Sequence, residues 1–163
     1  MIIDLSKIPS YWLTCEKSKD RWQKMKDMLS LIKIEAKMLN GKITSPYTIG
    51  VAMNHLDALK NEETCLILED DCSLLWCNHL IEVPDDADAL YLGTSLYGRI
   101  QNQTYYGLTL CKEHNESLYR IFNMLSMHSI VYISKRYISH TSSLLSQFIN
   151  NPLGGVDDSI ADS

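Results

Sequence analysis

The segment Thr64–Leu75, TCLILEDDCSLL, joins an apolar run to three adjacent carboxylates. The residues Cys65–Leu68 show no alternation of polar and apolar side chains, which is typical of a strand covered on both faces of a parallel or mixed sheet. Glu69, Asp70 and Asp71 follow directly, so the acids are expected at the end of this strand. Because ligand sites in open α/β sheets gather at the carboxyl ends of strands, we expect a binding site there.

Two interpretations of the three acids stay open. Neighbouring negative charges repel one another unless a cation or hydrogen bonds compensate them, and hard divalent metals bind carboxylate oxygens together with substrate phosphate oxygens. The first interpretation is therefore a metal site that binds a diphosphate. The second is a solvated acidic turn after a core strand. For the acidic loop Pro84–Asp88 the solvated interpretation is the stronger one, since no apolar run precedes its acids.

The composition narrows the class of protein. With 163 residues, 45% hydrophobic and 21% charged, we expect residues 1–163 to form a single domain, either complete or part of a longer polypeptide. A net charge of −5 without a basic stripe argues against nucleic acid as a partner. No apolar stretch reaches the roughly 18–20 residues of a membrane span and the N-terminus lacks a signal-peptide pattern, so we expect no transmembrane segment and a cytoplasmic location. The cysteines form no Cys-x-x-Cys pair, which indicates reduced thiols.

Strands and helices are expected to alternate through the first two thirds of the chain, which predicts a single α/β sheet. Besides the central strand, the predicted strands are Tyr11–Cys15, Ile34–Leu39, Ala89–Gly93, Tyr105–Cys111 and Ser129–Ser134, and residues 76–83 are expected to cross the sheet's edge. Helices are predicted from Lys19, with Ser18 as its cap, and over Thr48–Lys60 and Ser139–Ile149. No glycine-rich phosphate loop follows the first strand, so side chains and ordinary backbone groups would have to hold a nucleotide.

Two further features have open interpretations. The irregular segment 150–158 carries a second pair of carboxylates, Asp157 and Asp158. Either can act as a general base if it reaches an acceptor hydroxyl, and either can equally cap a helix that starts at Ser159. His55 lies alone on a predicted helix, where a histidine is more often a hydrogen-bonded structural residue than a ligand.

Five sequence motifs are more specific as an ordered series than any one of them is alone. They are Tyr11–Met25, Leu39–Gly41, Gly50–Leu59, Leu66–Asp71 and Ala87–Gly93. This series resembles the family of lipooligosaccharide and procollagen galactosyltransferases, with Asn54 where that family usually has serine. The resemblance implies a GT-A-like, Rossmann-like architecture: a mixed, mostly parallel central sheet flanked by helices. The family also has a histidine before its late strand, and here His128 precedes that strand with a spacing one residue longer.

The resemblance implies a metal-dependent glycosyltransferase that moves a sugar from a nucleotide-diphosphate sugar, such as a UDP-sugar, to a hydroxyl of a glycan or glycoprotein, with inversion. Mn²⁺ or Mg²⁺ held by Glu69 and Asp71 would neutralise the leaving diphosphate. The implied donor-binding residues are Thr14, Glu16, Arg21, Asn54, His55 and Asp70, of which Asp70 would face the sugar hydroxyls. Asp157 or Asp158 is the hypothesised catalytic base. A metal-dependent phosphatase or phosphotransferase and a non-catalytic nucleotide-sugar-binding module are the alternatives.

Overall fold

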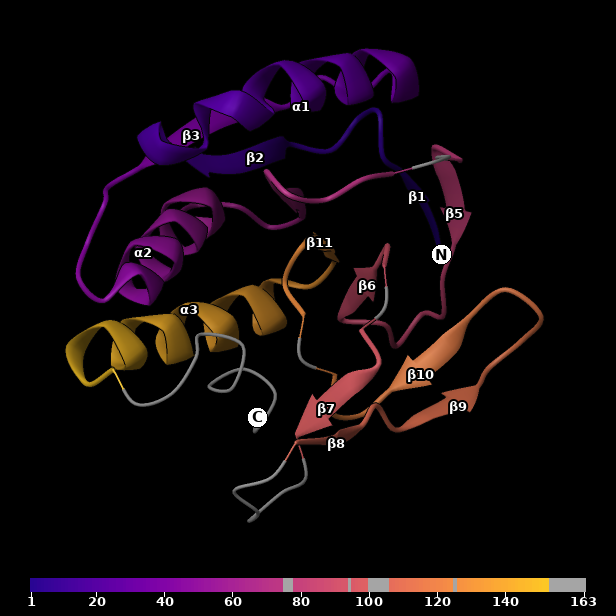
Figure 1. Ribbon diagram of the computed structural model, residues 1–163. Coiled ribbons are helices and arrows are strands. Elements are labelled where there is room, and N and C mark those ends of the chain that lie inside the picture. Colours follow the sequence, from indigo (N-terminus) through magenta and orange to yellow (C-terminus); the bar gives the residue numbers. More distant parts are fainter. Residues whose placement is uncertain (75–77, 94, 100–105, 125, 153–163) are drawn as a thin grey trace.

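A five-stranded mixed sheet forms the centre of the molecule (Figure 1). The computed structural model describes residues 1–74, 78–93, 95–99, 106–124 and 126–152. In spatial order the strands are β3 (Lys37–Gly41), β2 (Ser10–Cys15), β4 (Cys65–Glu69), β11 (Ser129–Tyr132) and β6 (Ala89–Tyr91). β2 pairs in parallel with β3 and β4, whereas β11 is antiparallel to β4 and β6, so four of these five strands point the same way. The mixed α/β class is confirmed, and the GT-A assignment stays a prediction.

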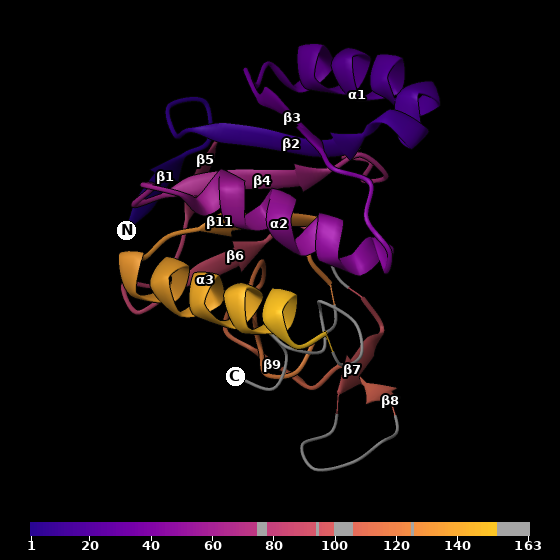
Figure 2. The ribbon, with the colours of Figure 1, turned by 90° about the vertical axis from the view of Figure 1, so that its left-hand side faces the viewer.

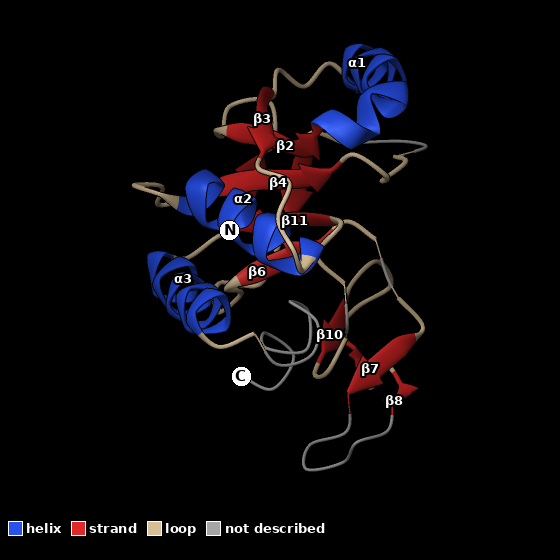
Figure 3. Cartoon of the chain, turned by 60° about the vertical axis from the view of Figure 1, so that its left-hand side comes forward, coloured by secondary structure: helices blue, strands red, loops and turns tan. Residues whose placement is uncertain are grey.

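Helices cover both faces of this sheet, as Figures 2 and 3 show. In the described part of the chain they are α1 (Lys19–Ile32), α2 (Tyr47–Leu59) and α3 (Lys135–Asn150). α2 and α3 lie side by side on one face, and α1 lies on the other (Figure 2). None of these helices combines the length and the apolar character that crossing a membrane requires.

The central strand β4 is buried from both sides. Cys65 and Ile67 belong to the core beneath α2 and α3, while Leu66 and Leu68 belong to the core beneath α1. All four residues have 0% of their surface exposed, and burying an aliphatic side chain of this size contributes about 1.5–3 kcal/mol. The prediction of a strand covered on both faces is therefore confirmed, and the acids follow at its carboxyl end.

The prediction of a single sheet is wrong. Three two-stranded sheets accompany the central one in the described residues: β1 (Ile2–Asp4) with β5 (Leu80–Glu82), β7 (Tyr97–Arg99) with β8 (Tyr106–Leu108), and β9 (Cys111–Glu113) with β10 (Tyr119–Ile121). Residues 79–83 therefore bond to the N-terminal segment instead of crossing the edge of the central sheet, and residues 76 and 77 lie outside the described residues. The strand expected over Tyr105–Cys111 is also divided among its described residues: β8 ends at Leu108 and β9 begins at Cys111, and between them the amide of Leu110 donates to the side chain of Asn123 instead of to a neighbouring strand.

Some predicted boundaries shift for local reasons. α1 begins at Lys19 as expected, but Ser18 belongs to a 3₁₀ turn, η1 (Glu16–Ser18), and its side chain makes no capping bond. The second strand begins at Lys37 instead of Ile34, since Lys33 adopts a left-handed conformation that ends α1 and Ile34 still bonds back to the helix. α3 begins at Lys135, four residues early, because the hydroxyl of Ser134 accepts a hydrogen bond from a first-turn amide.

Candidate functional site

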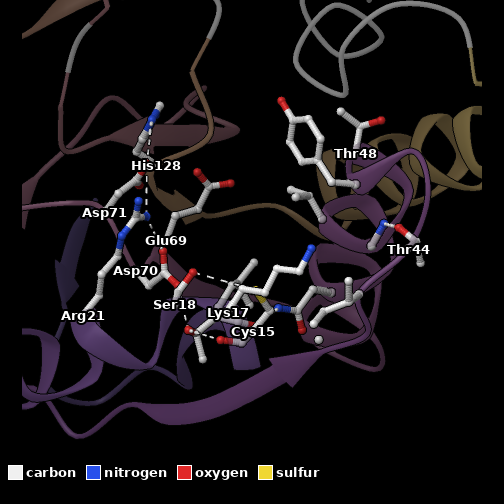
Figure 4. A pocket seen from close by; sticks show the side chains of 18 of the residues that line it. Cys15, Lys17, Ser18, Arg21, Thr44, Thr48, Glu69, Asp70, Asp71 and His128 are labelled. Atoms are coloured by element: carbon white, nitrogen blue, oxygen red, sulfur yellow. Dashed lines mark hydrogen bonds and ion pairs between the residues drawn. The ribbon is translucent and has the colours of Figure 1, made fainter.

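A cavity of about 770 Å³ opens where the parallel strands end. Its walls include the carboxyl ends of β2, β3 and β4 at Cys15, Gly41 and Glu69, and the segment that leads into α2. In Figure 4 the acids lie on one wall, Thr44 and Thr48 lie on the opposite wall, and the side chain of Lys17 extends between them. The sequence-based expectation that a binding site lies at this edge agrees with the position of the cavity.

Three side chains on one wall bring potential metal ligands together. One ligand atom each from Glu69, Asp71 and His128 lies within 4.8 Å of the others. His128 reaches the acids because β11 runs antiparallel to β4, and the amide of Glu69 donates to the carbonyl of His128 at 2.8 Å. Ser126 bonds to Nδ1 of His128 at 2.9 Å, while Nε2 lies 3.9 Å from Asp71 Oδ2. Asp71 and His128 are about half exposed, so the cluster is open to solvent.

Glu69 is held from beneath by α2. Nε2 of His55 lies 2.9 Å from Oε1 of Glu69, and His55 itself is fully buried. Burial of Glu69 opposes ionisation, but the hydrogen bond from His55 and the electrostatic influence of His55 and His128 outweigh it, so the pKa of Glu69 lies below its ordinary value. The carboxylate is therefore ionised at neutral pH, as a metal ligand must be.

Asp70 is engaged by protein donors on both of its oxygens. Thr14 donates its hydroxyl to Oδ2 at 2.6 Å, and Arg21 donates to Oδ1 at 2.9 Å. The indole of Trp22 in turn donates to the hydroxyl of Thr14 at 2.8 Å. Asp70 thus ties the ends of β2 and β4 to the start of α1, and its hydrogen bond raises the pKa of Arg21. A role for Asp70 in binding sugar hydroxyls stays a prediction.

Asn54 connects α2 to two strand ends. Its amide donates to the carbonyl oxygens of Thr14 and Leu39, both at 3.2 Å. A Cβ at Gly41 would lie 2.9 Å from this amide, so the close approach requires glycine at the end of β3. Asn54 therefore joins the ends of β2 and β3 to α2, and it also lines the cavity.

The predicted donor-binding residues divide into two groups. Thr14, Arg21, Asn54 and Asp70 line the cavity together with the predicted metal ligands. Glu16 and His55 are not among the lining residues. Glu16 pairs with Lys19 and accepts from the side chain of Asn40 at 2.7 Å, and these contacts lower its pKa. The proposed bases Asp157 and Asp158 lie outside the described residues.

Sequence reasoning gave no firm role to three residues that the structure brings to the site. His128 differs from the family pattern in its spacing, but it directly precedes the last strand. Because that strand pairs antiparallel with β4, its first residues lie beside the end of β4, and this brings His128 to the acids. Lys17 and Lys42 add positive charge to the cavity walls, one just after β2 and one just after β3. The position of Lys17 and Lys42 directly after the first two parallel strands is the sequence signal that could have placed them at the site.

No model of a known protein family matches the chain, and no curated protein matches it. The resemblance to galactosyltransferases therefore depends on the motifs alone.

Proposed function

We propose that the chain is a metal-dependent glycosyltransferase that uses a nucleotide-diphosphate sugar as donor. The observation that carries the proposal is the convergence of Glu69, Asp71 and His128 on the wall of a cavity of about 770 Å³. Pockets of roughly 300–1,000 Å³ accommodate ligands of drug or cofactor size. A glycan or glycoprotein acceptor and a cytoplasmic location remain predictions from the sequence.

The ligand set fits Mn²⁺ or Mg²⁺. Two carboxylates supply the oxygen ligands that these hard ions take, and an imidazole is compatible with Mn²⁺. Glu69, Asp71 and His128 would hold the ion, and the open side of the cluster leaves room for phosphate oxygens. When bound, the ion would act as a Lewis acid that neutralises the charge of the leaving diphosphate.

The remaining cavity residues fit an anionic nucleotide. Lys17 and Lys42 add positive charge to the cavity lining, whereas the charge of Arg21 is partly neutralised by Asp70. Ile43 and Val51 give the wall near α2 an apolar part that suits the flat face of a base or sugar. For the transfer itself, Asp157 or Asp158 remains the hypothesised base that accepts the proton of the acceptor hydroxyl.

Titration calorimetry with a panel of nucleotide sugars, with and without Mn²⁺, tests the proposal. We expect metal-dependent binding of one donor class, and we expect Asp71→Asn to abolish the dependence on metal. Sugar transfer to hydroxyl acceptors should follow with the same metal requirement. Binding without turnover would instead support a non-catalytic module, phosphate release from simple esters would support a phosphatase, and metal-independent binding untouched by Asp71→Asn would refute the metal site.

A further inference from the structure

His55 is a fully buried histidine with a polar contact to the candidate site. It has 0% of its surface exposed, and its Nε2 lies 2.9 Å from Oε1 of Glu69. Among the described residues its other ring nitrogen, Nδ1, is buried without a hydrogen-bond partner. A buried polar atom without a partner costs free energy, so the position demands an explanation beyond packing.

The contact selects one tautomer of the ring. With the proton on Nε2, the imidazole donates to the carboxylate and leaves only a lone pair of Nδ1 unpaired. With the proton on Nδ1, a buried N–H would lack an acceptor, and the lone pair of Nε2 would face the carboxylate. Of the two neutral forms, the Nε2–H tautomer is therefore the stable one, and His55 is a hydrogen-bond donor to Glu69.

We propose that His55 is a positioning residue that fixes the carboxylate of Glu69 for metal binding. Glutamate has several rotatable bonds, and only conformers that keep its oxygen beside Asp71 and His128 complete the cluster. The hydrogen bond from the rigid, buried ring restricts the carboxylate to such a conformer. This proposal rests on the metal site of the proposed function, and it assigns to His55 no direct contact with donor or metal.

The test compares His55→Leu with His55→Gln. Glutamine retains an amide donor that can reach Glu69, whereas leucine removes it. Loss of hydrogen bonds to metal-ligating groups typically weakens metal binding about 10–100-fold, so His55→Leu should weaken Mn²⁺ binding by that factor and His55→Gln should restore most of it. Mn²⁺ affinity is measured by electron paramagnetic resonance of the free ion. Leu59→Ala, a buried change on the same helix, is the matched control and should leave the affinity unchanged.

The outcomes separate this proposal from the proposed function. If the wild-type chain binds no Mn²⁺, the metal site and the role of His55 both fail. If the wild type binds Mn²⁺ and His55→Leu binds it equally well, only the role of His55 fails. Should His55→Leu not fold, ¹⁵N resonances of the wild-type imidazole decide: a proton on Nε2, with or without a second proton on Nδ1, supports the proposal, and a proton on Nδ1 alone overturns it.

Discussion

Replacing Asp70 by alanine should destabilise the fold, although Asp70 lies in the middle of the acidic cluster. Its side chain is only 11% exposed and accepts hydrogen bonds from Thr14 and Arg21. Thr14 is itself buried, so the substitution leaves its hydroxyl with only the 3.5 Å contact to the carbonyl of Cys15 as an acceptor. Hydrogen bonds to charged groups contribute about 1.5–3 kcal/mol, and a half-exposed ion pair contributes about 0–1 kcal/mol.

The expected loss is about 2–3 kcal/mol in the free energy of unfolding. For a chain of this length that corresponds to a decrease of roughly 4–12 °C in Tm. Urea denaturation followed by circular dichroism measures the free energy, and a thermal scan measures Tm. Asp71→Ala is the matched control. It also relieves the repulsion between adjacent acids, but the side chain of Asp71 is 45% exposed. Its stability should change by less than about 0.5 kcal/mol. Equal stability losses in the two variants would refute the assignment of Asp70 as the structural acid.

Three further predictions concern other parts of the chain. Asn54→Ala removes two hydrogen bonds to strand-end carbonyls and should cost about 1–3 kcal/mol in urea denaturation; a loss below that range would show that these bonds are unimportant. Hydrogen bonds from Ser134 and Arg136 hold the pKa of Asp88 below its ordinary value of 3.8, so its contribution to stability is present above that pH and is lost on acidification. The stability difference between wild type and Asp88→Asn should therefore shrink as the pH falls below 3.8. A difference that stays constant would contradict a lowered pKa of Asp88. Burial raises the pKa of Cys65 to about 12 whereas Cys111 is exposed, so peptide mapping after iodoacetamide treatment should find Cys111 labelled and Cys65 labelled only after unfolding.

The elements that were predicted well are those whose signal is local. The unbroken apolar run Cys65–Leu68 required cover on both faces, and the structure provides a helical layer on each side. α1 begins at Lys19, one turn before the apolar residues that recur along it from Trp22. The acids lie at the end of β4 because they directly follow its apolar residues in the sequence.

The features that escaped prediction depend on pairing between distant segments. His128 reaches Glu69 only because β11 inserts antiparallel between β4 and β6, and no local pattern encodes that order. The short strands β1 and β5 likewise form only because the N-terminal residues pair with a segment about eighty residues further along the chain. His55 is similar: helical periodicity placed it on α2, but its burial beneath Glu69 depends on how α2 packs on the sheet.

The most direct test of the central claim is to locate the metal. Crystals grown with Mn²⁺ and a nucleoside diphosphate, measured at the manganese absorption edge, give the ion's position from its anomalous signal. We predict one strong peak within ligand distance of Glu69, Asp71 and His128, with diphosphate oxygens completing the coordination. An anomalous map without a peak at these three side chains, from crystals that contain the bound nucleotide, would contradict the account.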